Sequence, residues 1–138
     1  MSDAATRLHA LRSAVADAAR VSRREPSEIT IVAVSKNRSA EQIEELIEAG
    51  QRHFGENRVQ EAAAKWPALK SRYPDVVLHM IGQLQSNKAE EAAALFDVIH
   101  SLDRPSLAAA LAKAIGSWRI QLGAFSRRAS AETLFARL

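Results

Sequence analysis

The sequence predicts an α/β fold, a partial (β/α) TIM-type barrel of about five βα units preceded by an N-terminal helix. Short apolar segments begin near residues 29, 52, 76, 97 and 118, roughly every 21 to 24 residues, and each is followed by a segment with helical periodicity. This alternation favours parallel strands joined by right-handed crossovers. No G-x-G-x-x-G pattern follows any apolar segment, which argues against an open dinucleotide-binding sheet.

Composition limits the class of protein. The chain has 138 residues, 47% of them apolar, enough to fill the core of one domain. No apolar run reaches the length of a membrane span, and the first twenty residues are too charged for a secretory signal, so a cytoplasmic location is expected. The chain has no cysteine and therefore no disulfide framework or thiol nucleophile. Its four histidines are scattered in the sequence, and no metal site is expected.

Charge is distributed unevenly along the chain. The formal net charge is +3, and the basic excess lies after residue 115, where four arginines face Glu132 alone. A basic tail can bind nucleic acid or acidic polymers, or it can have a different origin from the body of the chain. Four arginines without an aromatic platform are a poor case for nucleic acid, so no such partner is expected.

The first βα unit has the clearest signals. Residues 3–22 carry apolar side chains at three- and four-residue steps, the pattern of an amphipathic helix. Residues 29–35 are rich in β-branched side chains and predict a buried strand, which ends on Lys36. Ser39 and Gln42 form a capping box that begins a helix over residues 40–49, and Gly50 ends it.

The later units have weaker boundaries. A helix over about residues 57–72 contains Pro67, which is expected to kink or divide it, and Trp66, which is expected to pack against the sheet. The next helix is expected to begin with Ser86 or Asn87 as its cap. The one after it starts near residue 103, with Pro105 tolerated in its first turn.

In barrels of this kind functional residues lie just beyond the C-terminal ends of the strands. Lys36 in such a place could act as a Schiff-base amine, or it could be a solvated lysine whose methylenes cover the strand end. Asn57 could direct its amide at a ligand or cap the following helix. His79, midway along a strand, is expected to be a core histidine, and His100 near a strand end is a slightly better ligand candidate. Paired carboxylates, a Ser-His-Asp spacing and a P-loop are absent from the sequence.

Four motifs carry a resemblance to a known family. They are VAVSK at residues 32–36, AGQRHFGENRVQE at 49–61, HMIGQLQSNK at 79–88 and HSLD at 100–103. In this order and spacing they resemble the pyridoxal 5'-phosphate (PLP) homeostasis protein family, whose fold is a single barrel like the N-terminal domain of alanine racemase. The resemblance implies that Lys36 holds PLP as an internal aldimine and that Asn57 lies beside the cofactor. It also implies a cofactor carrier rather than an enzyme.

The resemblance covers roughly residues 4–115, the N-terminal half of a family chain, and the later strands of the family supply its phosphate-binding turns. Residues 118–126, and then 127–138, instead resemble the opening strand and helix of a sporulation-related repeat (SPOR) domain, a peptidoglycan-binding module. We therefore expect residues 1–115 to form a PLP-binding half-barrel and residues 116–138 to be a SPOR-like strand and helix, packed as a fifth βα unit. Open sheet edges would favour self-association.

Two alternatives remain open on the sequence alone. In the first hypothesis the half-barrel binds PLP through Lys36, with binding weakened by truncation because the phosphate contacts are missing. The alternative is a truncated or fused product without retained activity, or an interaction fragment with peptidoglycan-binding ancestry in its tail. No membrane partner is expected in either case.

Overall fold

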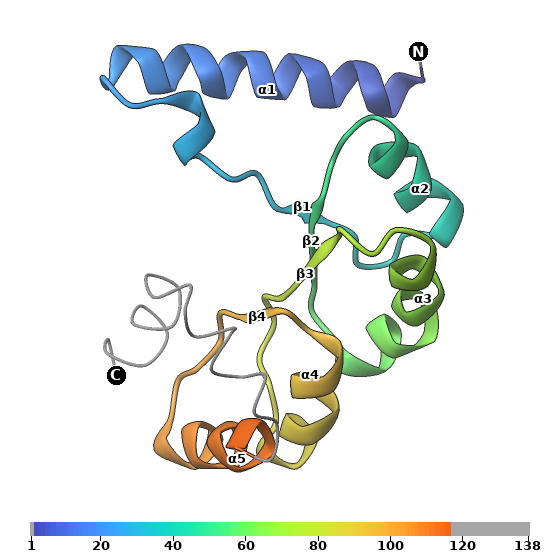
Figure 1. Ribbon diagram of the computed structural model, residues 1–138, viewed down its shortest axis with the longest axis vertical. Coiled ribbons are helices and arrows are strands. Elements are labelled where there is room, and N and C mark those ends of the chain that lie inside the picture. The colour runs from blue at the N-terminus through green and yellow to red at the C-terminus, as the bar shows by residue number, and fades with distance from the viewer. Residues whose placement is uncertain (1, 117–138) are drawn as a thin grey trace.

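The computed structural model describes residues 2–116, and they alternate between helices and short strands (Figure 1). The elements in chain order are α1 (Asp3–Val21), η1 (Pro26–Glu28), β1 (Ala33–Val34), α2 (Ala40–Glu48), β2 (His53–Glu56), α3 (Val59–Arg72), β3 (Val77–Met80), η2 (Ser86–Lys88), α4 (Ala89–Leu95), β4 (Val98–Ile99) and α5 (Pro105–Gly116). The predicted α/β alternation is confirmed.

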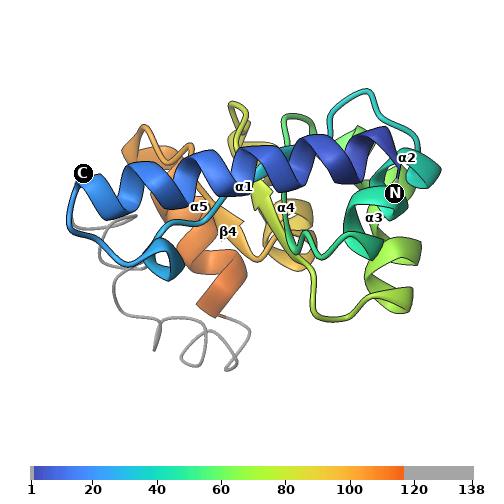
Figure 2. The same cartoon turned by 90° about the horizontal axis from the view of Figure 1, so that it is seen from above.

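One sheet organises these elements. Its four strands lie in the order β1-β2-β3-β4, and every neighbouring pair is parallel. Helices α2, α3 and α4 cover one face of the sheet, and α1 extends across one end of the fold (Figures 1 and 2). This arrangement is that of a partial barrel. The expected fifth βα unit and most of the SPOR-like segment begin beyond residue 116 and lie outside the described residues.

The first two helices both begin with a serine cap, of which the sequence predicted the second. The hydroxyl of Ser2 accepts a hydrogen bond from the Ala5 N–H at the start of α1. The capping box of Ser39 and Gln42 is formed at the start of α2, and Gly50 follows that helix with a φ of 103°, which a glycine adopts without strain. Among the described helices none is long and apolar enough to cross a lipid bilayer.

The first strand is shorter and less buried than predicted. Only Ala33 and Val34 of residues 29–35 form a strand, and the Val34 side chain is 52% exposed. The reason is that β1 pairs with β2 alone among the described strands, and β2 begins only at His53. Before β1, at Ile31, the side-chain amide of Gln51 donates to the backbone carbonyl at 2.7 Å, in place of a hydrogen bond from a neighbouring strand. The prediction of a seven-residue buried strand was therefore wrong.

Two other boundaries also differ from expectation. Helix α3 has Arg58 as its N-cap without a side-chain hydrogen bond, so Asn57 is not the cap, and Pro67 does not divide the helix. The segment at Ser86 forms the 3₁₀ turn η2 first, and α4 starts at Ala89 after it. Residue propensities indicated that a helix begins near each of these positions. The path of the chain from the preceding strand determined which residue is the first of the helix.

The core lies between the sheet and the helices that cover it. Trp66 of α3 is fully buried, and its ring lies 5.2 Å from that of Phe54 in β2, so the predicted packing of Trp66 on the sheet is confirmed. Leu78 and Met80 of β3 and Leu107 of α5 are buried in the same cluster. Packing on this face fixes the strands in place, and hence the edge at which they end.

Two glycines are in close contact with their neighbours at this edge, Gly82 with backbone and Gly55 with a side chain. A Cβ on Gly82 would lie 2.3 Å from the carbonyl oxygen of Asn57 and 2.7 Å from its Cα. A Cβ on Gly55 would lie 2.8 Å from Cδ1 of Ile81. Because the atoms facing Gly82 are backbone, they cannot move aside as a side chain can. Gly82 therefore determines how closely the loop after β3 packs on Asn57.

We predict that Gly82→Ala lowers the free energy of unfolding by about 1–3 kcal/mol, the range for inserting a methyl group into packed structure. Gly116→Ala is the control, because no atom of the described residues lies within 4 Å of a Cβ at that position. It should change stability by less than about 0.5 kcal/mol. Urea unfolding of both variants measures the difference, and equal stabilities would show that the loop after β3 adapts without cost.

Candidate functional site

The C-terminal ends of the four strands lie on one edge of the sheet because the strands are parallel. Lys36 follows β1 and Asn57 follows β2. Val34 and Gly55 are register partners, and each candidate residue lies two positions beyond one of them. The structure therefore brings the ends that carry Lys36 and Asn57 together, as expected from their strands.

Lys36 is exposed at the end of β1. It lies in a turn closed by a hydrogen bond from the Arg38 N–H to the Ser35 carbonyl, at 3.1 Å. Within residues 2–116 its ammonium group has no hydrogen bond and no ion pair. An amine in such a position is available to an electrophile that approaches the strand ends.

Asn57 lies at the end of β2 and is half-buried beneath the loop that carries Gly82. It lines a cavity of about 570 Å³. The other lining residues are Arg58, Val59, Gln60, Met80, Gln83, Leu84, Gln85, Lys88, Asp103 and Arg104. Lys36 is not among them, so the structure places one of the two predicted residues in this cavity and not the other.

Positive charge predominates in the cavity, since three of its side chains are cationic and only Asp103 is anionic. Arg104 is fixed there by hydrogen bonds to the carbonyl oxygen of Leu84 and to the Asp103 carboxylate. Sequence reasoning missed Arg58, Lys88 and Arg104 as a group. Their only signal was the polar composition of the segments after β2, β3 and β4, and the fold was needed to show that these segments converge.

Behind Lys36 lies a buried ionic cluster that the sequence did not reveal. Glu56, the last residue of β2, is 0% exposed, and its Oε2 accepts hydrogen bonds from the Ser35 hydroxyl at 2.6 Å and the Trp66 indole at 3.0 Å. The ammonium group of Lys65 lies 2.9 Å from the same oxygen and 2.8 Å from Glu61. A glutamate at the end of an apolar strand and a lysine on the buried side of a helix were the available signals.

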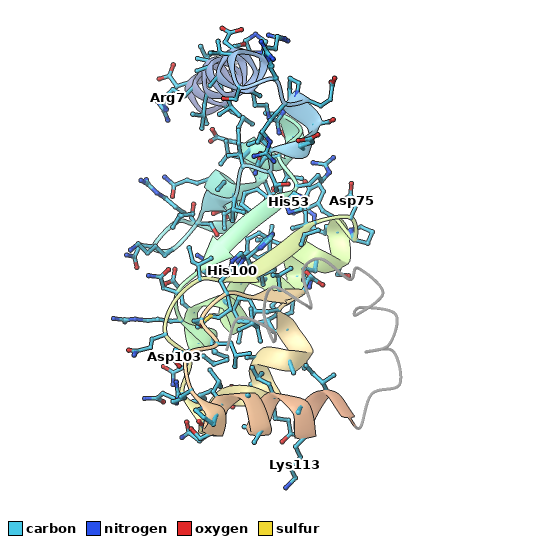
Figure 3. The ribbon with its side chains drawn as sticks, turned by 90° about the vertical axis from the view of Figure 1, so that its left-hand side faces the viewer. Arg7, His53, Asp75, His100, Asp103 and Lys113 are labelled. Atoms are coloured by element: carbon cyan, nitrogen blue, oxygen red, sulfur yellow. The ribbon has the colours of Figure 1, made fainter. Side chains whose placement is uncertain are left out.

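Three histidines form a hydrogen-bonded row across the sheet. His53 Nδ1 lies 2.9 Å from His79 Nε2, and His79 Nδ1 lies 2.9 Å from His100 Nε2. They come from β2, β3 and the end of β4, and Figure 3 labels the two outer members. Among the described residues no group of histidines and carboxylates is arranged to hold a metal ion.

Burial governs the protonation of this row. His79 is 6% exposed as a residue. Its burial, together with the neighbouring His100 and His53, lowers its pKa from 6.5 to about 4, against an opposing effect of Asp97. Burial also lowers the pKa of His100. The prediction that His79 is a core histidine is confirmed. His100 is hydrogen-bonded to His79 through its Nε2.

Comparison with known proteins identifies the relatives. No family model matches the chain. It is 43% identical over 112 residues to the pyridoxal phosphate homeostasis protein of Escherichia coli K12, which covers 80% of this chain and 48% of that protein. Over most of its length the chain is similar to the pyridoxal phosphate homeostasis proteins. The protein of that name from Vibrio cholerae is 43% identical over 89 residues, covering 63% of this chain.

Solved structures show a similar fold over most of this chain. PipY of Synechococcus elongatus PCC7942, solved with PLP bound, superposes with a TM-score of 0.71 at 46% identity, over 83% of this chain and 49% of PipY. A protein of unknown function from Bifidobacterium adolescentis superposes with a TM-score of 0.75 at 30% identity, over 85% of this chain. The chain thus spans about half the length of the pyridoxal phosphate homeostasis proteins and solved structures that it matches.

We predict that acid destabilises the protein through His79. Because folding lowers the pKa of His79 from 6.5 to about 4, the unfolded state binds the proton more readily. The free energy of unfolding should keep the full contribution of neutral His79 above about pH 6.5. It should fall as the pH drops toward about 4, and this residue should account for a loss of at most about 3 kcal/mol.

Urea unfolding across this pH range checks the effect. His79→Phe should lose less stability on acidification than the parent, whereas His9→Gln, which changes an exposed histidine of α1, should follow the parent. A His79→Phe curve parallel to that of the parent would contradict the assignment.

Proposed function

We propose that this chain binds PLP through Lys36 and serves in PLP homeostasis as a carrier of the cofactor rather than as an enzyme. The observation that carries the proposal is the amine of Lys36, exposed at a strand end and without an ion pair in the described part of the chain. A lysine held by a carboxylate would have to break that contact before it could react. Relatives named for PLP homeostasis, and PipY with PLP bound, supply the chemical class of the ligand.

The described residues fit the aldehyde end of PLP. When bound, PLP supplies an aldehyde, and a lysine amine condenses with it to form an imine and one water molecule. Lys36 provides the amine, which must lose its proton before the bond forms. Asn57, which follows the neighbouring strand, offers an amide donor and acceptor beside it. These two residues form the cofactor site that we propose, within residues 1–115.

Affinity depends on more than the imine. The family's later strands are expected to supply charge-assisted contacts to the phosphate, and such contacts are among the strongest hydrogen bonds in proteins. Residues 1–115, taken without those strands, should bind PLP weakly and reversibly. A product without retained activity remains the competing hypothesis, and it predicts no selective modification of Lys36.

We predict that PLP reacts selectively at Lys36. Adding PLP to the full chain should give an imine absorbance band, and borohydride reduction should then fix the adduct on Lys36, as read by peptide mass. Lys36→Ala should lose this adduct, whereas Lys113→Ala, which removes an exposed lysine of α5, should keep it. Label spread evenly over the surface lysines, or equal uptake by Lys36→Ala, would refute the proposal.

We also propose that the chain associates with itself through its sheet edges. Within the described residues β1 and β4 each have one strand neighbour, and an edge strand presents unpaired backbone groups to other chains. We predict an average mass above that of the monomer in sedimentation equilibrium, increasing with protein concentration. A monomer mass at every concentration would contradict this.

A further inference from the structure

The turn that carries Lys36 is tied to the rest of the fold at both of its ends. The Ser35 N–H donates to the carbonyl of Gly55 at 2.9 Å, which continues the pairing of β1 with β2. Asn37 follows Lys36 with a φ of 60°, a left-handed conformation that asparagine tolerates better than most residues. Such a turn needs contacts from outside itself to remain in one conformation.

Lys65 of α3 supplies those contacts. Its Nζ lies 2.8 Å from the carbonyl oxygen of Ser35 and 3.1 Å from that of Arg38, the first and last residues of the turn. The Lys65 side chain is only 12% exposed, and its bond to Ser35 is partly buried, whereas its bond to Arg38 lies at the surface. One ammonium group thus joins the two residues that flank the segment containing Lys36.

Two carboxylates hold the ammonium of Lys65 in place. Glu56 lies 2.9 Å from Nζ and also accepts a hydrogen bond from the Ser35 hydroxyl. Glu61 lies 2.8 Å from Nζ and accepts a hydrogen bond from the Asn37 N–H at 2.5 Å. The hydrogen bonds from Lys65 and Asn37 keep the pKa of Glu61 below its ordinary value, so Glu61 is a carboxylate at neutral pH. Backbone groups of Ser35, Asn37 and Arg38 are therefore all engaged, while the Lys36 amine is left out of the cluster.

We propose that Lys65 is a positioning residue for Lys36: with Glu56 and Glu61 it fixes the turn and so holds the Lys36 amine at the end of β1, in the proposed PLP site. This inference rests on the proposed function, since it describes how the fold presents the amine that PLP modifies. The cluster of Lys65, Glu56 and Glu61 contacts the residues on either side of Lys36 and leaves the Lys36 amine free to react.

Lys70 provides a matched control on the same helix. Its Nζ donates to the carbonyl of Leu95 at 3.0 Å and pairs with Asp97 at 2.9 Å, and its side chain is 26% exposed. Like Lys65 it ties α3 to a backbone carbonyl and a carboxylate, but it does so at the start of β4 and not at the turn of Lys36. Loss of Lys70 removes contacts of the same kinds, one to a carbonyl and one to a carboxylate, where Lys65 makes two of each. Only loss of Lys65 removes contacts of the turn that carries Lys36.

The experiment compares Lys65→Met, Lys65→Arg and Lys70→Met with the parent chain. Each is treated with PLP, reduced with borohydride and analysed for the rate of labelling at Lys36 and at the other lysines, and unfolding is followed separately. Lys65→Met should lower the rate at Lys36 at least about tenfold, since misplacing a reacting group by about 1 Å can cost about 100-fold. Lys65→Arg should recover part of the rate, and Lys70→Met should keep it.

Lys65→Met leaves the buried Glu56 without its cation and could unfold the chain. Glu61→Gln then tests the proposal in a folded protein, because Glu61 is more exposed than Glu56. The amide oxygen can still accept the hydrogen bond from Asn37, but the ion pair with Lys65 is lost. It should reduce selectivity for Lys36 in a folded protein. If the folded variants label Lys36 at the parent's rate, the positioning role is refuted and the proposed function stands. If the parent itself shows no preference for Lys36, the proposed function fails first.

Discussion

The carboxylate of Glu56 is the group around which the described structure is assembled. It lies at the end of β2 with no exposure to solvent, and a buried carboxylate is costly unless cations and hydrogen-bond donors compensate it. Here the donors come from the end of β1 and from α3, through Ser35, Trp66 and Lys65. The three elements must therefore assemble together, and the turn after β1 is fixed as a consequence.

The two faces of the sheet are filled by different means. Large apolar side chains such as Phe54 and Trp66 pack between the sheet and its helices. On the other face His53, His79 and His100 form a row of hydrogen bonds. One face thus gives the sheet its stability, and the other carries ionisable groups whose protonation is controlled by burial.

Local signals predicted well where they were self-contained. The capping box at Ser39, the stop at Gly50 and the burial of Trp66 follow from a few neighbouring residues, and the structure has all three. The extent of β1 was not local, because a strand continues only as far as its neighbour pairs with it, and β2 starts late. Likewise Asn57 suited a cap, but the chain enters α3 one residue later, at Arg58. The SPOR-like interpretation of residues 116–138 falls almost wholly outside the described residues and stays a prediction.

By itself the sequence determined the βα alternation, the parallel sheet and the two strand ends that carry Lys36 and Asn57, because hydrophobic periodicity and turn residues act over short distances. Only the tertiary structure decided what surrounds them. Lys65 and Glu56 are nine residues apart in the sequence, and Lys65 lies thirty residues from Ser35, yet all three meet at one edge. No pattern along a chain specifies which of many charged residues will meet after the strands have paired, and that meeting is what sets the position of Lys36.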